Sequence, residues 1–339
     1  MQNQNPITIG NISLSGRAVL APMSGVTDVV MRRIASRFGA SMVVSEMVAS
    51  DEFVLGNEEY RLRAEGSGLD LHVVQIAGCD PRWMGEAAQL AESSGADIID
   101  INMGCPAKRV IGGYAGSALM RDLDLACALI KATVDAVKIP VTVKMRLGWD
   151  HASMNAPELA RRAQDIGVQL VTVHGRTRNQ FYKGHADWSA IRKVRDAISI
   201  PLVANGDGTS TSDAKDMLLR SGADAVMIGR AALGKPWLIG QIARGLRDED
   251  DTAPDFAQRR AAAIDHYEGL LSLMGVSIGV KHIRKHIAAY VDDAAQSGHP
   301  LPDELRTALL TTEEPKTALA ILARLYDDVA DDVKVRAVA

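Results

Sequence analysis

Eight short apolar segments are the feature that most constrains the fold of this 339-residue chain. Most of them start roughly 25–30 residues apart, which is the length of one strand followed by one helix. The stretches between them carry apolar residues near the helical period, as in residues 83–93 and 158–165. The eight predicted strands are Arg17–Met23, Met42–Val48, Leu71–Gly78, Ile98–Gly104, Val141–Gly148, Leu170–Arg176, Pro201–Asp207 and Ala225–Arg230.

Continuous apolar strands separated by helices indicate a parallel sheet that is buried on both faces. Eight such units predict an α/β fold of the TIM (β/α)8-barrel class, because a doubly wound sheet usually stops at five or six strands. No GxGxxG fingerprint follows the first strand, which also disfavours a dinucleotide-binding domain. Gly95, Gly167 and Gly222 each precede a predicted strand and suit helix C-caps.

The pattern changes after about Leu246. An acidic segment, Asp248–Asp251, is followed by Pro254 and then by helical patterns alone. A barrel takes about 250 residues, so we expect a catalytic barrel at residues 1–246 and a small all-helical domain at 252–339. The helices of the second domain are expected at Asp255–Met274, Ile278–Ala295, Asp303–Leu310 and Lys316–Val329.

Composition narrows the class of protein. Three cysteines cannot form a disulfide framework and have no metal-ligand spacing, so we expect no metal. The first residues do not resemble a signal peptide, and no run of about 18 apolar residues could span a membrane. We therefore expect a cytoplasmic protein, and the sequence leaves its oligomeric state open. A net charge of −4 means that any nucleic-acid contact must be a local basic patch.

Polar side chains gather at the carboxyl ends of the predicted strands, where barrel enzymes place their active sites. Because residues i and i+2 of a strand point the same way, Lys144 and Arg146 should both face the barrel mouth, and so should Asp100 and Asn102. Burying a lysine or arginine without a partner costs several kcal/mol. The cluster therefore predicts an anionic ligand.

Glycine-rich turns after the seventh and eighth strands predict a phosphate cradle. These turns are Asn205–Gly208 and Gly229-Arg230, and glycine lets backbone N–H groups approach a phosphate closely. Lys144 would stabilise the anionic reduced ring of a flavin beside its N1–C2=O edge, and Gln75 could hydrogen-bond the polar edge of that ring.

Cys105 is the predicted reactive cysteine. It stands in a Gly-Cys-Pro turn just past the fourth strand, which exposes its thiol at the catalytic end. A neutral thiol with an ordinary pKa of about 8.5 can donate a proton near neutral pH. Cys127 lies in an apolar helical run and is expected to be structural, whereas Cys79, in a loop, is left open.

Together these segments resemble the tRNA-dihydrouridine synthase family, and within it the bacterial B-type, nitrogen-regulation-related branch. The resemblance runs from about residue 6 to the helical tail, and the cysteine-centred motif followed by HGRTR is its most specific part. The matching motifs are Ala21–Asp28, Asp100–Pro106, Gly112–Met120, Val143–Leu147, His174–Arg178, Asn205–Asp207 and Gly229-Arg230.

The resemblance implies an FMN enzyme in which NADPH (or NADH) reduces the flavin and the flavin passes a hydride to C6 of a tRNA uridine. Cys105 would then protonate C5, and the uridine must first leave its stack. Asn102, Arg146 and Tyr182 fall where relatives contact the uracil. The residues implied to hold FMN are Pro22, Met23, Ser24, Gln75, Lys144, His174, Asn205, Gly206, Asp207, Gly229 and Arg230.

The helical domain is expected to contact tRNA. Its segment 280–291 has one apolar face, formed by Val280, Ile283, Ile287 and Val291. From Leu246 onward the chain holds about 11 basic and 17 acidic residues, so the RNA patch must be local. The residues expected to contact RNA are Lys281, Arg284 and Lys285, supplemented by Arg176, Arg178 and Lys183 near the barrel mouth.

Three other functions share parts of this pattern. An FMN-dependent barrel oxidoreductase acting on a free pyrimidine or another small conjugated molecule would keep the flavin site, but has less reason for a helical domain. An RNA-binding barrel without turnover would have no use for a flavin. An isomerase or aldolase could use Lys144 as a Schiff base, which leaves the Gly-Cys-Pro turn without a role.

Overall fold

The computed structural model describes residues 6–112 and 114–327, and divides into two compact units. The first consists of the chain up to Arg230 together with Ile239–Asp251, and the second of Ala231–Leu238 with the chain from Thr252 onward. The short segment 231–238 thus groups with the helical unit, although it follows the last predicted strand directly. Which function each unit serves stays a prediction.

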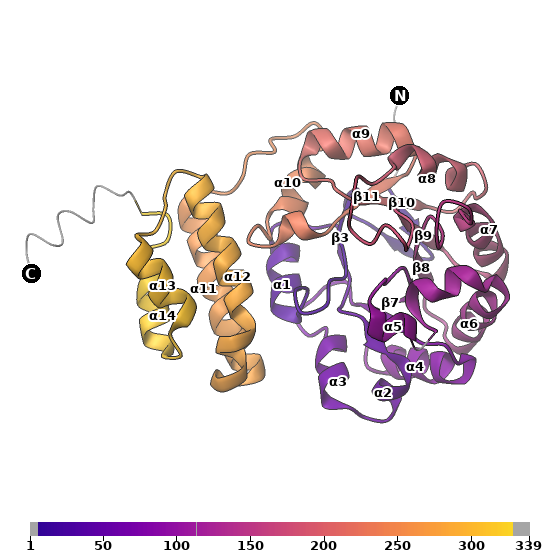
Figure 1. The fold of residues 1–339 in the computed structure, drawn as a ribbon, viewed down its shortest axis with the longest axis horizontal. Helices are drawn as coiled ribbons and strands as arrows, with labels where there is room; N and C mark the ends of the chain where they lie inside the picture. The colour runs from indigo at the N-terminus through magenta and orange to yellow at the C-terminus, as the bar shows by residue number, and fades with distance from the viewer. Residues whose placement is uncertain (1–5, 113, 328–339) are drawn as a thin grey trace, which may run out of the picture. The chain divides into compact units, whose positions relative to one another are not determined.

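The first unit is a closed barrel, as predicted (Figure 1). All ladders of its main sheet are parallel, in the order β4-β3-β11-β10-β9-β8-β7-β6-β5. Val44 bridges Val73 and so closes the sheet on itself. The strands are β3 (Ala18–Leu20), β4 (Met42–Val43), β5 (Val48–Ala49), β6 (Val73–Ala77), β7 (Ile98–Met103), β8 (Val141–Arg146), β9 (Leu170–His174), β10 (Leu202–Asn205) and β11 (Ala225–Ile228).

The second predicted strand, Met42–Val48, is divided into β4 and β5. Between them Ser45 uses its hydroxyl to accept the N–H of Gln75 at 2.9 Å and to donate to the carbonyl of Glu46 at 2.8 Å. A side chain therefore takes the place of a ladder bond, and the strand breaks where Glu46 turns toward the mouth. This explains why nine short strands correspond to the eight predicted segments.

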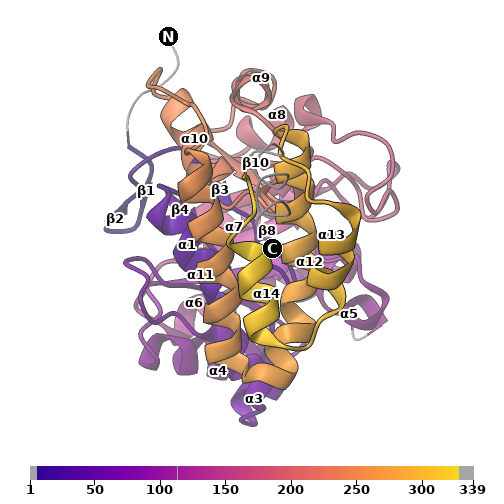
Figure 2. The same cartoon turned by 90° about the vertical axis from the view of Figure 1, so that its left-hand side faces the viewer.

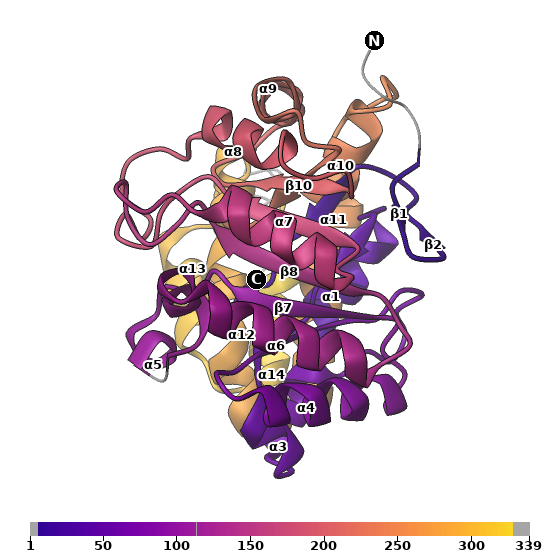
Figure 3. The same ribbon diagram turned by 90° about the vertical axis from the view of Figure 1, so that its right-hand side faces the viewer.

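Helices cover the outside of the barrel (Figures 1 and 3). The predicted C-caps are confirmed, since Gly95, Gly167 and Gly222 have φ of 89°, 120° and 67°. The helices of this part of the chain are α1 (Val29–Arg37), α2 (Ser50–Val54), α3 (Glu58–Ala64), α4 (Pro81–Ser93), α5 (Lys108–Gly112), α6 (Leu123–Ala136), α7 (Ala156–Ile166), α8 (Trp188–Arg195), α9 (Thr211–Ser221) and α10 (Leu238–Gly245), with 3-10 turns η1 (Gly116–Arg121) and η2 (Arg230–Ala232).

An antiparallel hairpin that the sequence pattern did not indicate precedes the barrel: β1 (Thr8–Ile9) and β2 (Ile12–Ser13). It is visible at the edge of the barrel in Figure 3. Ile9 and Leu14 pack with residues from the amino ends of the strands, among them Ile98 and Leu170. The hairpin therefore covers the amino end of the barrel and leaves the carboxyl end for a site.

The second unit contains the predicted helices α11 (Phe256–Met274), α12 (Val276–Gln296), α13 (Asp303–Thr311) and α14 (Pro315–Leu322) (Figure 2). Asp255 and Gln258 form a reciprocal capping box at the start of α11. The last helix ends at Leu322, before the predicted end at Val329, which lies outside the described residues.

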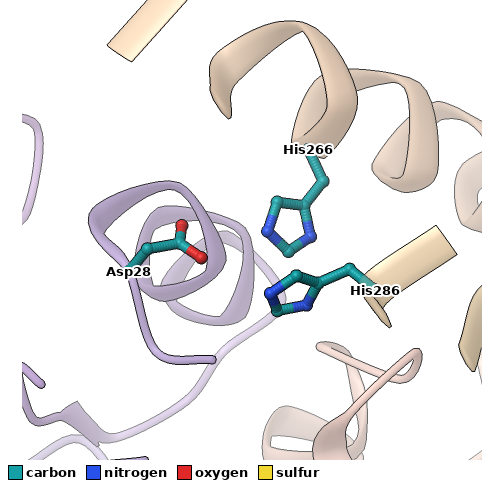
Figure 4. Close-up of side chains that lie close together, drawn as sticks. All are labelled: Asp28, His266 and His286. Carbon is teal, nitrogen blue, oxygen red and sulfur yellow. The ribbon is translucent and has the colours of Figure 1, made fainter. Parts of the chain in front are cut away.

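The apolar face predicted for residues 280–291 is confirmed, because Val280, Ile283, Ile287 and Val291 are all buried. His266 of α11 and His286 of α12 are buried too, with ring centroids 4.3 Å apart (Figure 4). Within the described residues, no helix is both long enough and apolar enough to cross a bilayer.

Candidate active site at the carboxyl end of the barrel

A buried polar network lies inside the strands beneath the barrel mouth. Gln75 donates to Asp100 at 2.6 Å and accepts from Asn102 at 2.8 Å, while Thr142 donates to the second Asp100 oxygen at 2.6 Å. Asp100 and Asn102 thus lie on one side of β7, as the i, i+2 rule predicted. Burial raises the pKa of Asp100. Gln75 is 0% exposed, so it supports its neighbours from below.

The turn that carries Cys105 is held rigidly. The Asn102 side-chain oxygen accepts the N–H groups of Gly104 at 3.1 Å and Cys105 at 2.9 Å. Ser117 donates both its hydroxyl and its N–H to the Cys105 carbonyl, at 2.8 and 3.0 Å. Gly116, with φ of 59°, leaves no room for a side chain, because an added Cβ would lie 2.9 Å from that carbonyl oxygen. The backbone of the thiol is therefore pre-positioned.

The Cys105 side chain is partly exposed and faces a cavity of about 400 Å³. Ser24, from the loop after β3, lines the same cavity. Cys79, Tyr60 and Trp83 line it as well, and the sequence pattern singled out neither aromatic residue. One sequence signal could have identified Trp83 as a site residue, because it stands in the first turn of the helix that follows a barrel strand.

Lys144, His174 and Asn205 meet on the inner side of β8, β9 and β10. The Lys144 ammonium donates to the Asn205 side-chain oxygen at 3.1 Å, and the Asn205 amide donates to the Met227 carbonyl at 2.7 Å. Burial, aided by the charge of Arg146, lowers the pKa of Lys144 to about 8. Burial and the surrounding cations, Lys144 first, hold the pKa of His174 well below its usual value, so His174 is neutral.

Arg146 is 1% exposed and joins three loops. It donates to the carbonyls of Gly104 at 2.7 Å, Thr177 at 3.0 Å and Phe181 at 2.8 Å. Burial lowers its pKa to about 10, which still leaves it charged at neutral pH. Tyr182, predicted to contact substrate, is 54% exposed and lies over Arg146 and Arg230, with its ring centroid 5.4 and 5.1 Å from the two guanidinium carbons.

Arg176 forms a two-point ion pair with Asp207, at 2.8 and 2.6 Å. It also donates to the carbonyls of Lys183 and Gly184, and it is 2% exposed. Arg176 thus holds Asp207 and the 183–184 loop inside the protein, and its expected RNA contact stays a prediction. Arg178, by contrast, is only partly buried and lies 4.5 Å from the ring centroids of both Trp149 and Phe181.

The turns predicted to cradle a phosphate are tightly packed. At Gly206, with φ of 123°, an added Cβ would lie 2.6 Å from the Ala186 Cβ, so only glycine fits. Asp207 also has a positive φ, 59°, and is fixed by the Ala186 N–H at 2.7 Å. The loop that contains Pro22 and Met23 lies next to Gly229, because a Cβ added at Gly229 would be 3.6 Å from the Met23 sulfur.

The basic residues of α12 belong to the other unit. Lys281 and Lys285 are exposed on α12. Arg284 is engaged within its own unit, with the Thr311 carbonyl at 3.3 Å and the Glu313 carboxylate at 3.6 Å. The structure therefore does not bring these residues together with the barrel residues in one unit.

The donor set of the barrel mouth fits an anionic ligand. Lys144 has one neutral hydrogen-bond acceptor, and the charges of Lys144, Arg146, Arg176 and Arg230 all act on His174. Asp207 is paired with Arg176 and Arg230, and the buried Asp100 acts on Lys144, so the cations of this group outnumber its carboxylates. A buried excess of positive charge is costly without an anion to balance it. An anionic ligand that carries a phosphate group would satisfy this requirement.

Comparison with known proteins gives one consistent result. The family model described as dihydrouridine synthase matches residues 19–329. The chain is 52% identical to a probable tRNA-dihydrouridine synthase of Rhizobium leguminosarum bv. phaseoli, over 93% of this chain and 96% of the relative. It is 48% identical to a probable tRNA-dihydrouridine synthase of Rickettsia conorii (97% and 99%), and 43% identical to tRNA-dihydrouridine synthase B of Xanthomonas axonopodis pv. citri (94% and 95%).

Solved structures resemble the fold at low sequence identity. The old yellow enzyme homologue of Zymomonas mobilis matches with a TM-score of 0.51 at 16% identity, over 75% of this chain and 95% of that one. The 6-hydroxypseudooxynicotine amine oxidase of Pseudomonas geniculata matches with a TM-score of 0.56 at 15% identity, over 79% and 51%. These likenesses concern the barrel fold alone.

Proposed function

We propose, since this chain belongs to the dihydrouridine synthase family, that it reduces uridine in tRNA to 5,6-dihydrouridine. The observation that carries the proposal is the rigid Cys105 turn at the carboxyl end of the barrel, near a group of buried cations. The contact of Arg146 with the carbonyl of Gly104, the residue before Cys105, at 2.7 Å supports this proposal.

FMN is the proposed cofactor, with NADPH or NADH as the reductant. When bound, FMN would supply the hydride that adds to C6 of the uracil ring. Lys144 and neutral His174 would bind its ring, and Gln75 would support them from below. The backbone of Asn205–Asp207 and Gly229-Arg230 would hold its phosphate, and Pro22–Ser24 would form the facing wall.

The residues of the chain then have distinct tasks. Hydride addition at C6 places negative charge on the C5–C4–O4 system of uracil, and the nearby cations Lys144 and Arg146 stabilise that charge. Cys105 donates a proton to C5. Asn102 holds the Cys105 turn, because its oxygen accepts two N–H groups there. Tyr182, an exposed aromatic residue of this region, would contact the flipped nucleotide.

The proposed partner is tRNA, and the proposed place of action is the cytoplasm, where tRNA is modified. Barrel residues 1–246 would carry the chemistry, and helical residues 252–339 would add RNA contacts. The alternative, reduction of a free pyrimidine or a similar small molecule on the same flavin site, predicts turnover of uridine or orotate at rates comparable with tRNA.

Replacing the thiol tests the proposal. We expect Cys105→Ala to bind FMN and to be reduced by NADPH at the normal rate, and to lose about 10²–10⁴-fold of its tRNA reduction, the range of general acid catalysis. The measurement is dihydrouridine formed in unmodified tRNA, with flavin absorbance followed separately. Cys127→Ala, on the covering helix α6, is the matched control.

Normal dihydrouridine formation by Cys105→Ala would remove the thiol from the reaction. Wild-type protein that reduces free uridine or orotate as fast as tRNA would favour the small-molecule alternative. Protein that purifies without flavin and cannot be reconstituted with FMN would end the proposal.

A further inference from the structure

Two arginines stack on one tryptophan at the carboxyl end of the barrel. The Arg121 guanidinium carbon lies 4.2 Å from the centroid of the Trp149 ring, and that of Arg178 lies 4.5 Å from it. The three residues come from three successive connections, after β7, β8 and β9. We call Arg121, Trp149 and Arg178 the stack.

The stack is not neutralised by acidic side chains. Within the described residues, Arg121 forms no ion pair and no side-chain hydrogen bond. The guanidinium of Arg178 donates only to the neutral side chain of Asn179, at 3.1 Å, and its buried Nε has no acceptor. Two acids adjoin the stack in sequence, and both are engaged locally. Asp122 accepts the N–H of Leu125 at 2.9 Å, and Asp150 accepts from Ala152 and Ser153 of its own turn.

Other arginines that lie on aromatic rings of this barrel differ in this respect. Arg82 lies over Trp83 and is paired with Glu86 at 2.7 Å. Arg220 lies over Trp188 and is paired with Asp216 at 3.6 Å. Tyr182 also lies over two arginines, but one of them, Arg230, is paired with Asp207 at 3.4 Å. Among the aromatic rings of the described residues, Trp149 therefore differs in having two arginines that both lack an ion pair.

The stack is also fixed relative to the reactive thiol. The N–H groups of Arg178 and Asn179 donate to the carbonyls of Gly148 and Trp149, both at 2.9 Å. Arg146 donates to the loop at Thr177 and Phe181 and to Gly104, the residue before Cys105. The buried guanidinium of Arg146 thus connects the stack to the Cys105 turn. A ligand bound to the stack is therefore held at a fixed position relative to the thiol.

We propose that the stack is a second RNA contact on the barrel, which binds backbone phosphates of the nucleotides flanking the target uridine. Guanidinium groups match phosphate geometrically, and stacking on Trp149 keeps them flat and oriented. Phosphate contacts position a strand without specifying its sequence. The inference rests on the proposed function and adds to it, because it assigns Arg121 and Trp149, which neither the sequence pattern nor the flavin site called for.

Removing one charge tests the proposal. For Arg121→Ala we expect a roughly five- to tenfold higher KM for tRNA at low salt, with kcat nearly unchanged. The slope of log(kcat/KM) against log salt should become shallower by about 0.7–0.9, as for one lost phosphate contact. Arg121→Lys should retain much of the affinity and Arg121→Glu should lose more. NADPH-driven reduction of the flavin should be unchanged in all three variants.

Arg220→Ala is the matched control, since Arg220 also lies on a tryptophan and stands at the opposite end of its helix from the barrel mouth. It should leave KM and the salt slope unchanged. Direct binding of unmodified tRNA, followed by fluorescence anisotropy, separates this inference from the proposed function. Weakened binding by Arg121→Ala supports the stack even if the wild type proves inactive.

An unchanged Kd and an unchanged salt slope in Arg121→Ala would overturn the inference while leaving the synthase function intact. A fall in kcat with normal KM would also overturn it, because the stack would then act on the geometry of Cys105. If the variant bound tRNA normally but lost affinity for an acidic protein instead, the partner assigned to this surface would be wrong.

Discussion

The barrel mouth and the helical unit treat their positive charges in opposite ways. At the mouth, Lys144 and Arg146 are balanced by few acids and bond mainly to amide and carbonyl oxygens. In the helical unit, the buried carboxylate of Asp293 receives Lys235 at 3.2 Å, Arg259 at 3.5 Å and the Tyr326 hydroxyl at 2.8 Å. Burial and the charge of Asp293 raise the pKa of Tyr326, so it remains a donor.

This difference distinguishes the charges that stabilise the fold from the charges that bind a ligand. A buried cation paired with a carboxylate stabilises the unit that contains both, provided that neither partner is removed. A buried cation that faces only neutral oxygens lowers stability until an anion arrives. We therefore read the barrel mouth as a ligand site and the Asp293 cluster as a structural one.

Lys144→Met should give the largest effect, because it removes the cation closest to the proposed flavin ring. We expect about a 10²–10³-fold loss of kcat/KM for tRNA, the range seen when one stabilising donor is lost. The apoprotein should be no less stable than the wild type, since an unpaired buried charge has been removed. Steady-state assays measure kcat/KM, and chemical denaturation measures the stability of the apoprotein. A variant that is less stable than the wild type but fully active would show that Lys144 serves the fold and not the ligand site.

The same lysine predicts a pH dependence. Its pKa in the folded apoprotein, about 8, is below the unfolded value, so folded Lys144 is charged below pH 8 and neutral above it. FMN affinity should therefore fall as pH rises from 7 to 9, whereas Lys144→Met should bind weakly with no such fall. Between pH 8 and about 10.5 the unfolded chain holds the extra proton, so this group makes the unfolding free energy rise with pH.

Asp293 tests the structural role of paired charges in the helical unit. Asp293→Asn leaves Arg259 and Lys235 without their shared anion, and breaking such a buried pair costs about 3 kcal/mol. We expect that loss in urea unfolding of the full chain, with FMN binding unchanged. Asp292→Asn is the matched control: its partner Arg306, at 3.2 Å, is exposed, and such pairs contribute about 0–1 kcal/mol. Equal losses in both variants would contradict the structural role of Asp293.

The sequence predicted the barrel because strand and helix alternate with a regular period, and periodicity is a local property. It also predicted which side of β7 and β8 carries Asp100, Asn102, Lys144 and Arg146, since strand alternation requires it. It could not predict which partner each side chain contacts. Arg146 donates to three backbone carbonyls that belong to loops distant in the sequence.

Arg176 and the stack also depend on contacts that a local sequence pattern does not predict. Arg176 stands in a basic motif, yet the loop at 183–184 and Asp207 enclose it, and no local pattern encodes that closure. Arg121 and Trp149 are separated along the chain and meet only because their strands are neighbours. Ser45 breaks the second strand through one hydroxyl, a contact that apolar patterning does not register.

Lys281→Ala should give the smallest effect. Lys281 is exposed on α12 in a unit whose arginines are mostly paired with acids, for example Arg284 with Glu313 and Arg306 with Asp292. One solvated phosphate contact should change the KM for tRNA about twofold at low salt, and less at physiological salt. Lys316→Ala, exposed on α14, is the control. If Lys281→Ala raised KM more than Arg121→Ala, the helical unit, and not the barrel mouth, would be the principal RNA surface.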